Sequence, residues 1–215
     1  MTVRCRKCGA TTGLPLCVEC GVLQMPPEAD HFALLGLEQR YDVPVEQVEA
    51  RQRELSRLVH PDRFAMASPE ERRLSLLWAT SINDAVKTLR DPIRRAEYML
   101  RLRGIDVRSE QGGRKADPGF LMEMLELREE LQTATRRKDD AAVQALVASV
   151  EKRRKALLSD VEKAFAEGGA GNNGEAPSRE ALERIAKMLE ALRYLGRFLE
   201  EALAYEDRRD AEAGV

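Results

Sequence analysis

Residues 53–71, RELSRLVHPDRFAMASPEE, contain the end of one predicted helix and the start of the next. Pro61 disfavours helical geometry at His60, so the first of these helices ends there. The second begins at the capping box Ser-Pro-Glu-Glu of residues 68–71, whose proline takes the first helical position. The sequence therefore predicts two antiparallel helices joined by an irregular tip, residues 60–67.

The helix before the tip runs from about residue 44 to residue 59. Its apolar residues recur at helical spacing and form one stripe, made up of Val45, Val48, Leu55, Leu58 and Val59. Arg53 and Arg57, which are four residues apart, lie on the opposite face. This pattern predicts an amphipathic helix that exposes a pair of arginines.

The helix after the tip stops before the Asp-Pro pair at residues 91–92. The apolar residues on one of its sides are Leu74, Leu77, Trp78, Ile82, Ala85 and Leu89. A short helix that begins near His31, with Asp30 as its N-cap, and a segment around residues 93–102 flank the two long helices. Residues 31–104 therefore form one predicted helical unit.

A second helical region follows a polar connector at residues 105–117. It contains three helical patterns, at about residues 119–137, 139–166 and 178–207. The glycine-rich loop at residues 168–174 lacks the Gly-Lys-Ser/Thr of a nucleotide-binding turn, so we read it as a flexible connection. The pattern predicts a three-helix bundle over residues 118–207, and the fold class is all-α.

Composition supports this fold class and excludes several functions. Ala, Glu, Lys, Leu and Arg make up just over half of the 215 residues, and aromatic residues only 5%. No apolar run approaches the ~20 residues of a membrane span, and we see no signal peptide, so we expect a cytoplasmic protein without a membrane partner. The net charge of −2 argues against a generic polyanion binder.

All four cysteines of the chain lie in residues 1–24, as two C-x-x-C pairs: Cys5, Cys8, Cys17 and Cys20. Four thiolates at this spacing can surround one tetrahedral ion, and structural Zn²⁺ is the expected occupant. Four cysteine ligands leave no place for a catalytic water. A redox C-x-x-C and an iron or iron–sulfur site remain alternatives. Only eight residues separate the pairs, fewer than the roughly 15–20 of the usual spacing.

The triplet His60-Pro61-Asp62, at the tip between two helices, resembles the activating element of J-domains, the partners of DnaK-type chaperones. Residues 81–85 (SINDA) through 89–98 (LRDPIRRAEY) resemble the third and fourth helices of J-domains. Residues 104–106 (GID) and 120–131 (FLMEMLELREEL) are similar, more narrowly, to HscB, the J-type co-chaperone of iron–sulfur cluster biogenesis. Metazoan members of that family carry a comparable tetracysteine zinc module with wider spacing.

The resemblance implies that His60, Pro61 and Asp62 engage a DnaK/HscA-type chaperone and stimulate its ATPase. The chemistry would then be the partner's, and the chain itself would not be an enzyme. Arg53, Arg57 and Arg63 would offer positive charge to an acidic chaperone surface. The alternative interpretation of Arg53 and Arg57 is a solvated helix face.

The first helix of the bundle shows two apolar faces. Its core stripe consists of Phe120, Met124, Leu127 and Leu131. The resemblance implies that residues outside this stripe bind the cluster scaffold IscU: Leu121, Met122, Leu125, Glu126 and Glu129, together with Tyr194 of the last helix. The alternative is a second core stripe, since a bundle helix touches two neighbours.

In the last helix, the predicted core stripe is Leu182, Ile185, Leu189, Leu192, Leu199 and Leu203. Tyr194 and Phe198 fall outside this stripe, and we assign Phe198 to the core.

The sequence thus favours a co-chaperone that binds the IscU scaffold, delivers it to the chaperone and promotes cluster assembly and transfer. The alternative is a zinc-ribbon nucleic-acid-binding protein with a helical interaction domain, suggested by Arg4, Arg6 and Lys7 beside the cysteines. The chain offers no continuous basic face, so we expect no nucleic-acid partner. The oligomeric state stays open.

Overall fold

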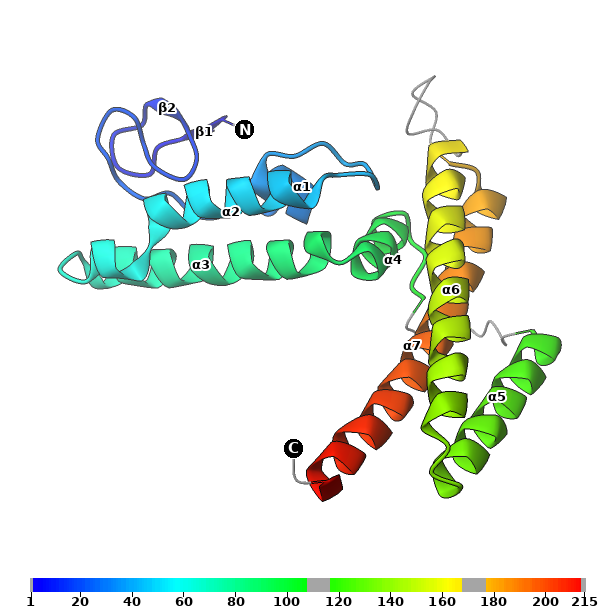
Figure 1. The fold of residues 1–215 in the computed structure, drawn as a ribbon. Coiled ribbons are helices and arrows are strands. Elements are labelled where there is room, and N and C mark those ends of the chain that lie inside the picture. The colour runs from blue at the N-terminus through cyan, green and yellow to red at the C-terminus, as the bar shows by residue number, and fades with distance from the viewer. Residues whose placement is uncertain (1, 108–116, 168–176, 214–215) are drawn as a thin grey trace. The chain divides into compact units, whose positions relative to one another are not determined.

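The computed structural model describes residues 2–107, 117–167 and 177–213, which are mainly helical (Figure 1). The chain divides into two compact units, Met1–Arg95 and Ala96–Val215. The all-α prediction is confirmed. Most of the predicted connector and of the glycine-rich loop lies outside the described residues.

The first unit is built on the predicted hairpin, α2 (Val45–Val59) and α3 (Pro69–Arg90), which lie side by side (Figure 1). The tip between them contains a 3₁₀ helix, η1 (Pro61–Phe64). Ser68 caps α3 as predicted, because its side chain accepts a hydrogen bond from the backbone N–H of Glu71. The turn signals in the sequence therefore place both helix ends correctly.

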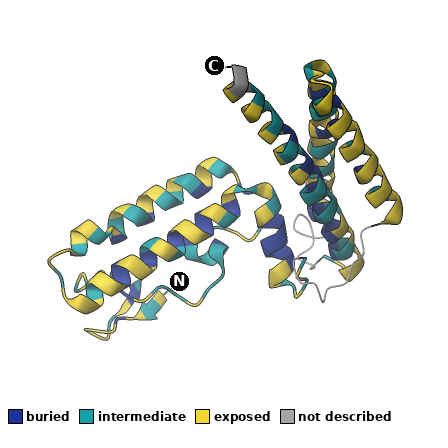
Figure 2. Ribbon diagram, turned by 90° about the horizontal axis from the view of Figure 1, so that it is seen from below, coloured by how far each residue is buried: buried dark blue, intermediate teal, exposed yellow. Residues whose placement is uncertain are grey.

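The buried face of α3 differs from the prediction at one position, since Leu77 is 43% exposed. Buried and exposed residues alternate along the helices in Figure 2. At ~100° per residue, the buried residues of α3 cover an arc of about 120° from Leu74 to Val86, and Leu77 lies about 60° outside it. Ser75 also lies inside the arc. Its hydroxyl can be buried there because it donates a hydrogen bond of 2.6 Å to the carbonyl of Val59.

Two short helices flank the hairpin along the chain: α1 (His31–Leu35), which contacts α3, and α4 (Pro92–Leu102), which contains the boundary between the two units. Asp30 caps α1 as predicted by accepting the N–H of Ala33 at 2.9 Å. Gly36 ends it with φ 67°, a left-handed conformation that favours glycine.

The cysteine segment belongs to the same compact unit as the hairpin. It contains an antiparallel pair of three-residue strands that the sequence did not predict, β1 (Thr2–Arg4) and β2 (Thr11–Gly13). Leu23 is fully buried, and the indole N–H of Trp78 donates to the carbonyl of Gln24 at 2.7 Å. The segment is therefore packed against α3.

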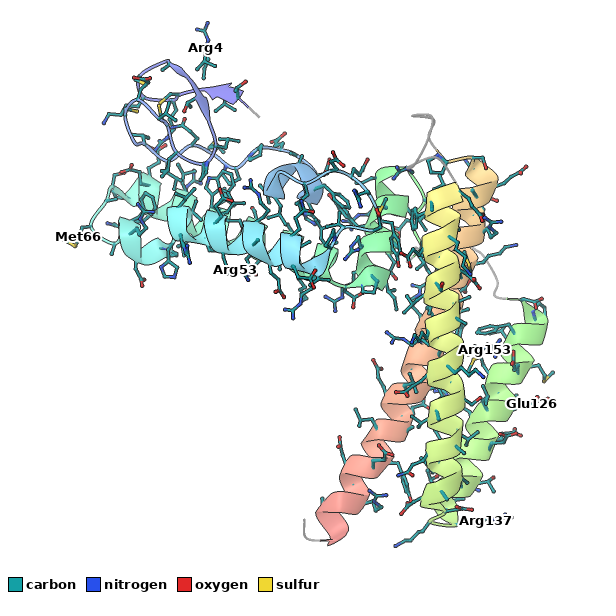
Figure 3. The ribbon with its side chains drawn as sticks, turned by 45° about the horizontal axis from the view of Figure 1, so that its top comes forward. Arg4, Arg53, Met66, Glu126, Arg137 and Arg153 are labelled. Atoms are coloured by element: carbon teal, nitrogen blue, oxygen red, sulfur yellow. The ribbon has the colours of Figure 1, made fainter. Side chains whose placement is uncertain are left out.

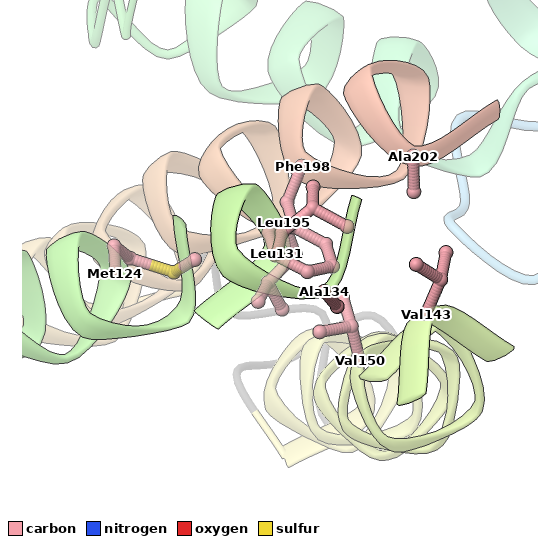
Figure 4. Packing of buried hydrophobic residues seen from close by; sticks show 8 residues of the cluster. All are labelled: Met124, Leu131, Ala134, Val143, Val150, Leu195, Phe198 and Ala202. Carbon is pink, nitrogen blue, oxygen red and sulfur yellow. The ribbon is translucent and has the colours of Figure 1, made fainter. Parts of the chain in front are cut away.

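The second unit contains the three predicted bundle helices, α5 (Pro118–Arg136), α6 (Asp140–Phe165) and α7 (Arg179–Ala213). Figure 4 shows their shared apolar core, formed by Met124, Leu131, Ala134, Val143, Val150, Leu195, Phe198 and Ala202. Phe198 is buried, as predicted.

The predicted core stripe of α7 is wrong at Leu203, which is 57% exposed. The buried positions turn around α7 toward its C-terminus: at ~100° per residue, Leu195, Phe198 and Ala202 lie about 120–180° around the helix from Leu189. This rotation follows from α7 packing against both α5 and α6. A single straight stripe therefore describes only the first half of the helix.

Candidate functional site

The first candidate site is the cysteine cluster. The four Sγ atoms of Cys5, Cys8, Cys17 and Cys20 lie within 4.8 Å of one another. Two of the separations are 3.5 Å, between Cys5 and Cys20, and 3.7 Å, between Cys8 and Cys17. Sulfur atoms ~2.3 Å from a tetrahedral Zn²⁺ would lie about 3.8 Å apart. The arrangement of the thiols therefore fits such an ion.

Each C-x-x-C pair is followed by a glycine that closes a matching turn. The N–H of Gly9 donates to the carbonyl of Cys5 at 3.0 Å, and that of Gly21 to the carbonyl of Cys17 at 2.8 Å. Both glycines have positive φ, 74° and 70°, which other residues adopt only with strain. The two turns thus present their sulfur atoms to one centre in the same way.

The surrounding backbone favours thiolates at this centre. The N–H of Cys8, with help from that of Lys7, lowers the pKa of Cys5 to about 6. The N–H of Ala10 lowers the pKa of Cys8, but its thiol neighbours and burial outweigh it and raise that pKa to about 12. The neighbouring sulfurs therefore oppose one another's ionisation, and a bound cation would offset that opposition.

The second candidate site is the tip of the hairpin. The ring Nδ1 of His60 accepts a hydrogen bond from the backbone N–H of Asp62 at 3.3 Å. This bond and the fixed φ of Pro61 hold the turn, while the carboxylate of Asp62 is 91% exposed. The Asp62 side chain is thus presented to solvent from an ordered backbone.

Basic side chains extend from the tip along α2. Arg53 and Arg57 are exposed, as predicted, and Arg53 lies 3.9 Å from Glu49 (Figure 3). Arg63 has a structural contact as well, since its guanidinium donates to the carbonyl of Arg57 at 2.6 Å. That contact places positive charge at the C-terminal end of α2, where the helix dipole favours it.

The third candidate site is a groove between α5 and α7, with a volume of about 190 Å³. Its lining residues are Leu121, Met124, Leu125, Arg128, Tyr194, Arg197 and Phe198. Leu121 and Leu125 are 38% and 53% exposed, so they are not a second core stripe. Three of the residues predicted to bind a scaffold therefore meet in one apolar hollow.

Aromatic and ionic contacts fix the wall of this groove. The ring of Tyr194 packs edge-to-face on Phe120 with centroids 5.7 Å apart. The guanidinium carbon of Arg197 lies over the Tyr194 ring, 4.9 Å from its centroid. Arg128 bridges α5 to α7 through two hydrogen bonds to Glu201, one of 2.9 Å, and this contact lowers the pKa of Glu201. Tyr194 is thereby held at the groove with little rotational freedom.

The other predicted scaffold-binding residues lie beyond the groove. Met122 is 59% exposed on the crest of α5. Glu126 and Glu129 line a separate, open hollow of about 660 Å³ on the side of α6. Figure 3 labels Glu126 on α5 and Arg153 on α6. The guanidinium of Arg153 donates a hydrogen bond to the carboxylate of Glu123. The predicted set therefore spans the outer surface of α5 rather than one pocket.

Sequence reasoning missed two basic residues of the groove, Arg128 and Arg197. Arg128 is three residues after Leu125 and Arg197 is three after Tyr194, so each lies one helical turn from a predicted residue. Extending the predicted face by one turn would have found both. The burial of Gln24 and its hydrogen bond to Trp78 could not be predicted in this way, because they depend on the packing of the cysteine segment against α3.

A helical hairpin with His-Pro-Asp at its tip, joined to a three-helix bundle, is the architecture of a J-domain co-chaperone. A family model described as the HSCB C-terminal oligomerisation domain matches residues 116–203. The "Co-chaperone protein HscB homolog" of Bordetella pertussis is 38% identical over 164 residues, which cover 75% of this chain and 95% of that protein. The chain belongs to the HscB co-chaperone family.

Solved structures agree with this assignment. Human co-chaperone protein HscB has a TM-score of 0.81 and 29% identity, and the match covers 95% of this chain and 98% of that one. Chaperone HscB from Vibrio cholerae has a TM-score of 0.69 and 31% identity, over 84% of this chain and 99% of that one. Among the described residues, no helix combines the length and apolar character needed to span a bilayer.

Proposed function

We propose that the protein is a co-chaperone of iron–sulfur cluster biogenesis that performs no catalysis itself. It captures an IscU-type scaffold on the outer surface of α5 and the α5–α7 groove. It delivers that scaffold to a DnaK/HscA-type chaperone and stimulates the chaperone's ATPase. One observation carries the proposal: a chain of the HscB family presents both an exposed Asp62 at an ordered tip and an apolar groove, with Glu126 and Glu129 beyond the edge of that groove on α5.

The tip acts on the chaperone through charge and shape. The exposed carboxylate of Asp62 can pair with a cationic side chain, and Pro61 sets its exit angle. Binding to one conformation of the chaperone more tightly than to the other shifts its conformational equilibrium toward hydrolysis. Arg53, Arg57 and Arg63 attract an acidic surface and raise the association rate.

The groove acts on the scaffold through apolar contact. Leu121, Leu125 and Tyr194 offer an exposed apolar centre next to the bundle core. Met122 extends it over the crest of α5, and Glu126 and Glu129 provide a polar rim that favours a basic edge on the scaffold. This division into an apolar centre and a charged rim is typical of protein interfaces.

The cysteine centre holds structural zinc in this proposal, bound by Cys5, Cys8, Cys17 and Cys20. A closed tetrahedral site of four thiolates supplies folding energy to a segment that has little apolar core of its own. The four cysteines form no disulfide, which leaves all four sulfurs available to the ion, and we place the protein in the cytoplasm. Elemental analysis of purified protein distinguishes zinc from iron.

An ATPase assay tests the proposal. The hydrolysis rate of an HscA-type chaperone is measured alone, with this protein, with an IscU-type scaffold, and with both. We expect stimulation by this protein and a larger, synergistic stimulation by the pair. A chaperone rate that this protein leaves unchanged at saturating concentration contradicts the co-chaperone role. Stimulation without synergy contradicts the role of the groove.

A further inference from the structure

Gln24 connects the cysteine centre to the rest of the first unit. It is 3% exposed, and its side-chain amide lies between two groups of the cysteine segment. The Nε2 group donates to the carbonyl of Val22 at 2.6 Å and to the Sγ of Cys5 at 3.6 Å, and Oε1 accepts the backbone N–H of Arg6 at 3.0 Å. A change in the charge or position of the Cys5 sulfur therefore acts directly on Gln24.

The backbone of Gln24 is also attached to α3. Its carbonyl accepts the indole N–H of Trp78, which is 1% exposed in the hairpin core. A buried N–H without an acceptor is costly, so separating Trp78 from Gln24 is unfavourable. The cysteine centre and α3 are thus linked through one residue.

Arg6 makes a second connection, at the start of α3. Its Nε donates to the carbonyl of Leu23 at 2.9 Å, and its Nη1 forms an ion pair with Glu70. Glu70 lies in the first turn of α3, two residues after the Ser68 cap and directly beyond the tip. Because this ion pair engages the guanidinium of Arg6, Arg6 has a structural role. It is then less available to bind the phosphates of a nucleic acid.

The far side of the tip is attached to α3 as well. The buried hydroxyl of Ser75 donates to the carbonyl of Val59, the residue before His60. The end of α2 is therefore held by Ser75 of α3. The cysteine segment in turn contacts α3 at Glu70 and Trp78.

We propose that Gln24 and Arg6 are positioning residues that couple metal occupancy of the cysteine centre to the conformation of the His60–Asp62 tip. With the metal bound, the segment holds the first turns of α3 and the tip in the arrangement that engages the chaperone. Loss of the metal releases Gln24 and Arg6 and loosens the tip. The coupling is a property of this chain, and only its effect on ATPase stimulation rests on the proposed function.

Amide hydrogen exchange tests the coupling without any partner. Exchange of peptides covering residues 60–80 is compared in zinc-loaded and chelator-stripped full-length protein, with zinc content measured in each sample. We expect exchange in the first turns of α3 to be about tenfold faster without zinc. Unchanged exchange there, with zinc removal verified, overturns the proposal.

Variants separate coupling from metal binding. Gln24→Ala and Arg6→Gln should show fast exchange in α3 while still retaining zinc. Arg6→Lys keeps the ion pair with Glu70 and should stay close to the wild type. Arg4→Ala and Lys7→Ala are matched controls, because they remove exposed basic residues of the same segment. Fast exchange in both controls would show a general loosening of the segment and overturn the assignment to Gln24 and Arg6.

Chaperone stimulation gives a second readout. Zinc removal should raise several-fold the concentration of wild-type protein needed for half-maximal stimulation. In Gln24→Ala, zinc removal should change that concentration little. Equal effects of zinc removal in wild type and in Gln24→Ala overturn the coupling. Where wild-type protein gives no stimulation at all, the proposed function fails, and the exchange experiment still decides whether the coupling exists.

Discussion

The tip and the α5–α7 groove are built in opposite ways. The tip is made from consecutive residues 60–67, and its bonds reach no further than the adjoining turns of α2 and α3. The groove combines residues 121–128 with residues 194–201, which are brought together only by bundle packing. The tip offers a charge on a rigid turn, and the groove offers apolar area beside the core.

This difference predicts different responses to mutation. Asp62 is almost fully exposed, so its replacement should alter binding and leave stability unchanged. The groove residues lie next to Met124 and Phe198 of the core, so a change there can affect both binding and folding. Substitutions at the two surfaces therefore need different controls.

The largest expected effect is at the tip. His60→Gln or Asp62→Asn should abolish stimulation of the chaperone's ATPase, because each removes a group of the triplet that we propose engages the chaperone. Scaffold affinity and the melting temperature should stay close to the wild-type values. The check is steady-state ATPase at saturating protein, with circular dichroism for the fold. Full stimulation by both variants would contradict the role of the tip.

The next effect is at the groove. The double substitution Leu121→Ala with Leu125→Ala should weaken scaffold binding by about 2–4 kcal/mol, because it removes exposed apolar anchors. Isothermal titration calorimetry measures the loss, and stimulation of the chaperone without scaffold should be unchanged.

Leu131→Ala is the matched control for this pair, since Leu131 is 5% exposed in the bundle core. It should lower the free energy of unfolding by roughly 2–5 kcal/mol. If the double variant loses stability to a similar extent, Leu121 and Leu125 are core residues and the groove assignment fails.

A smaller effect is expected on α2. Arg53→Ala with Arg57→Ala should slow association with the chaperone up to about tenfold at low salt, because the arginines act mainly by long-range attraction. The difference should shrink as salt is raised, since the Debye length falls from ~10 Å at 0.1 M to ~3 Å at 1 M. Stopped-flow association across salt concentrations measures it. Equal rates at low salt would support the solvated-face interpretation.

The smallest effect is expected at the ion pair that bridges the groove. Arg128→Ala should lower the free energy of unfolding by no more than about 1 kcal/mol, because both partners are largely exposed. Urea denaturation measures this change. A much larger loss would mean that the bridge, rather than apolar packing, holds α5 against α7.

The contrast also explains what the sequence could predict. Pro61, Ser68 and Asp30 act on their own neighbours, so the helix ends and the tip follow from local rules. The clustering of the cysteines likewise follows from spacing, and the structure agrees. Apolar periodicity located all three bundle helices.

Features that depend on which helix packs where were harder to predict. Leu77 and Leu203 are apolar and nearly in phase with the predicted core stripes of α3 and α7. Both are nevertheless exposed, because the segments that pack on these two helices cover a different part of the helix surface. The separation of Glu126 from the groove depends on the position of α6. The burial of Gln24 depends on Trp78, 54 residues away. None of these has a local signal.

The different origins of the two surfaces bear on the order in which they form during synthesis. Domains fold as the chain emerges from the ribosome, and contacts between nearby residues form fastest. The unit that contains the hairpin and its tip ends at Arg95, whereas the groove needs Tyr194 and Phe198. A growing chain therefore displays the His-Pro-Asp turn for about 100 residues of elongation, roughly 5–20 seconds at ~5–20 residues per second, before the proposed scaffold-binding groove exists.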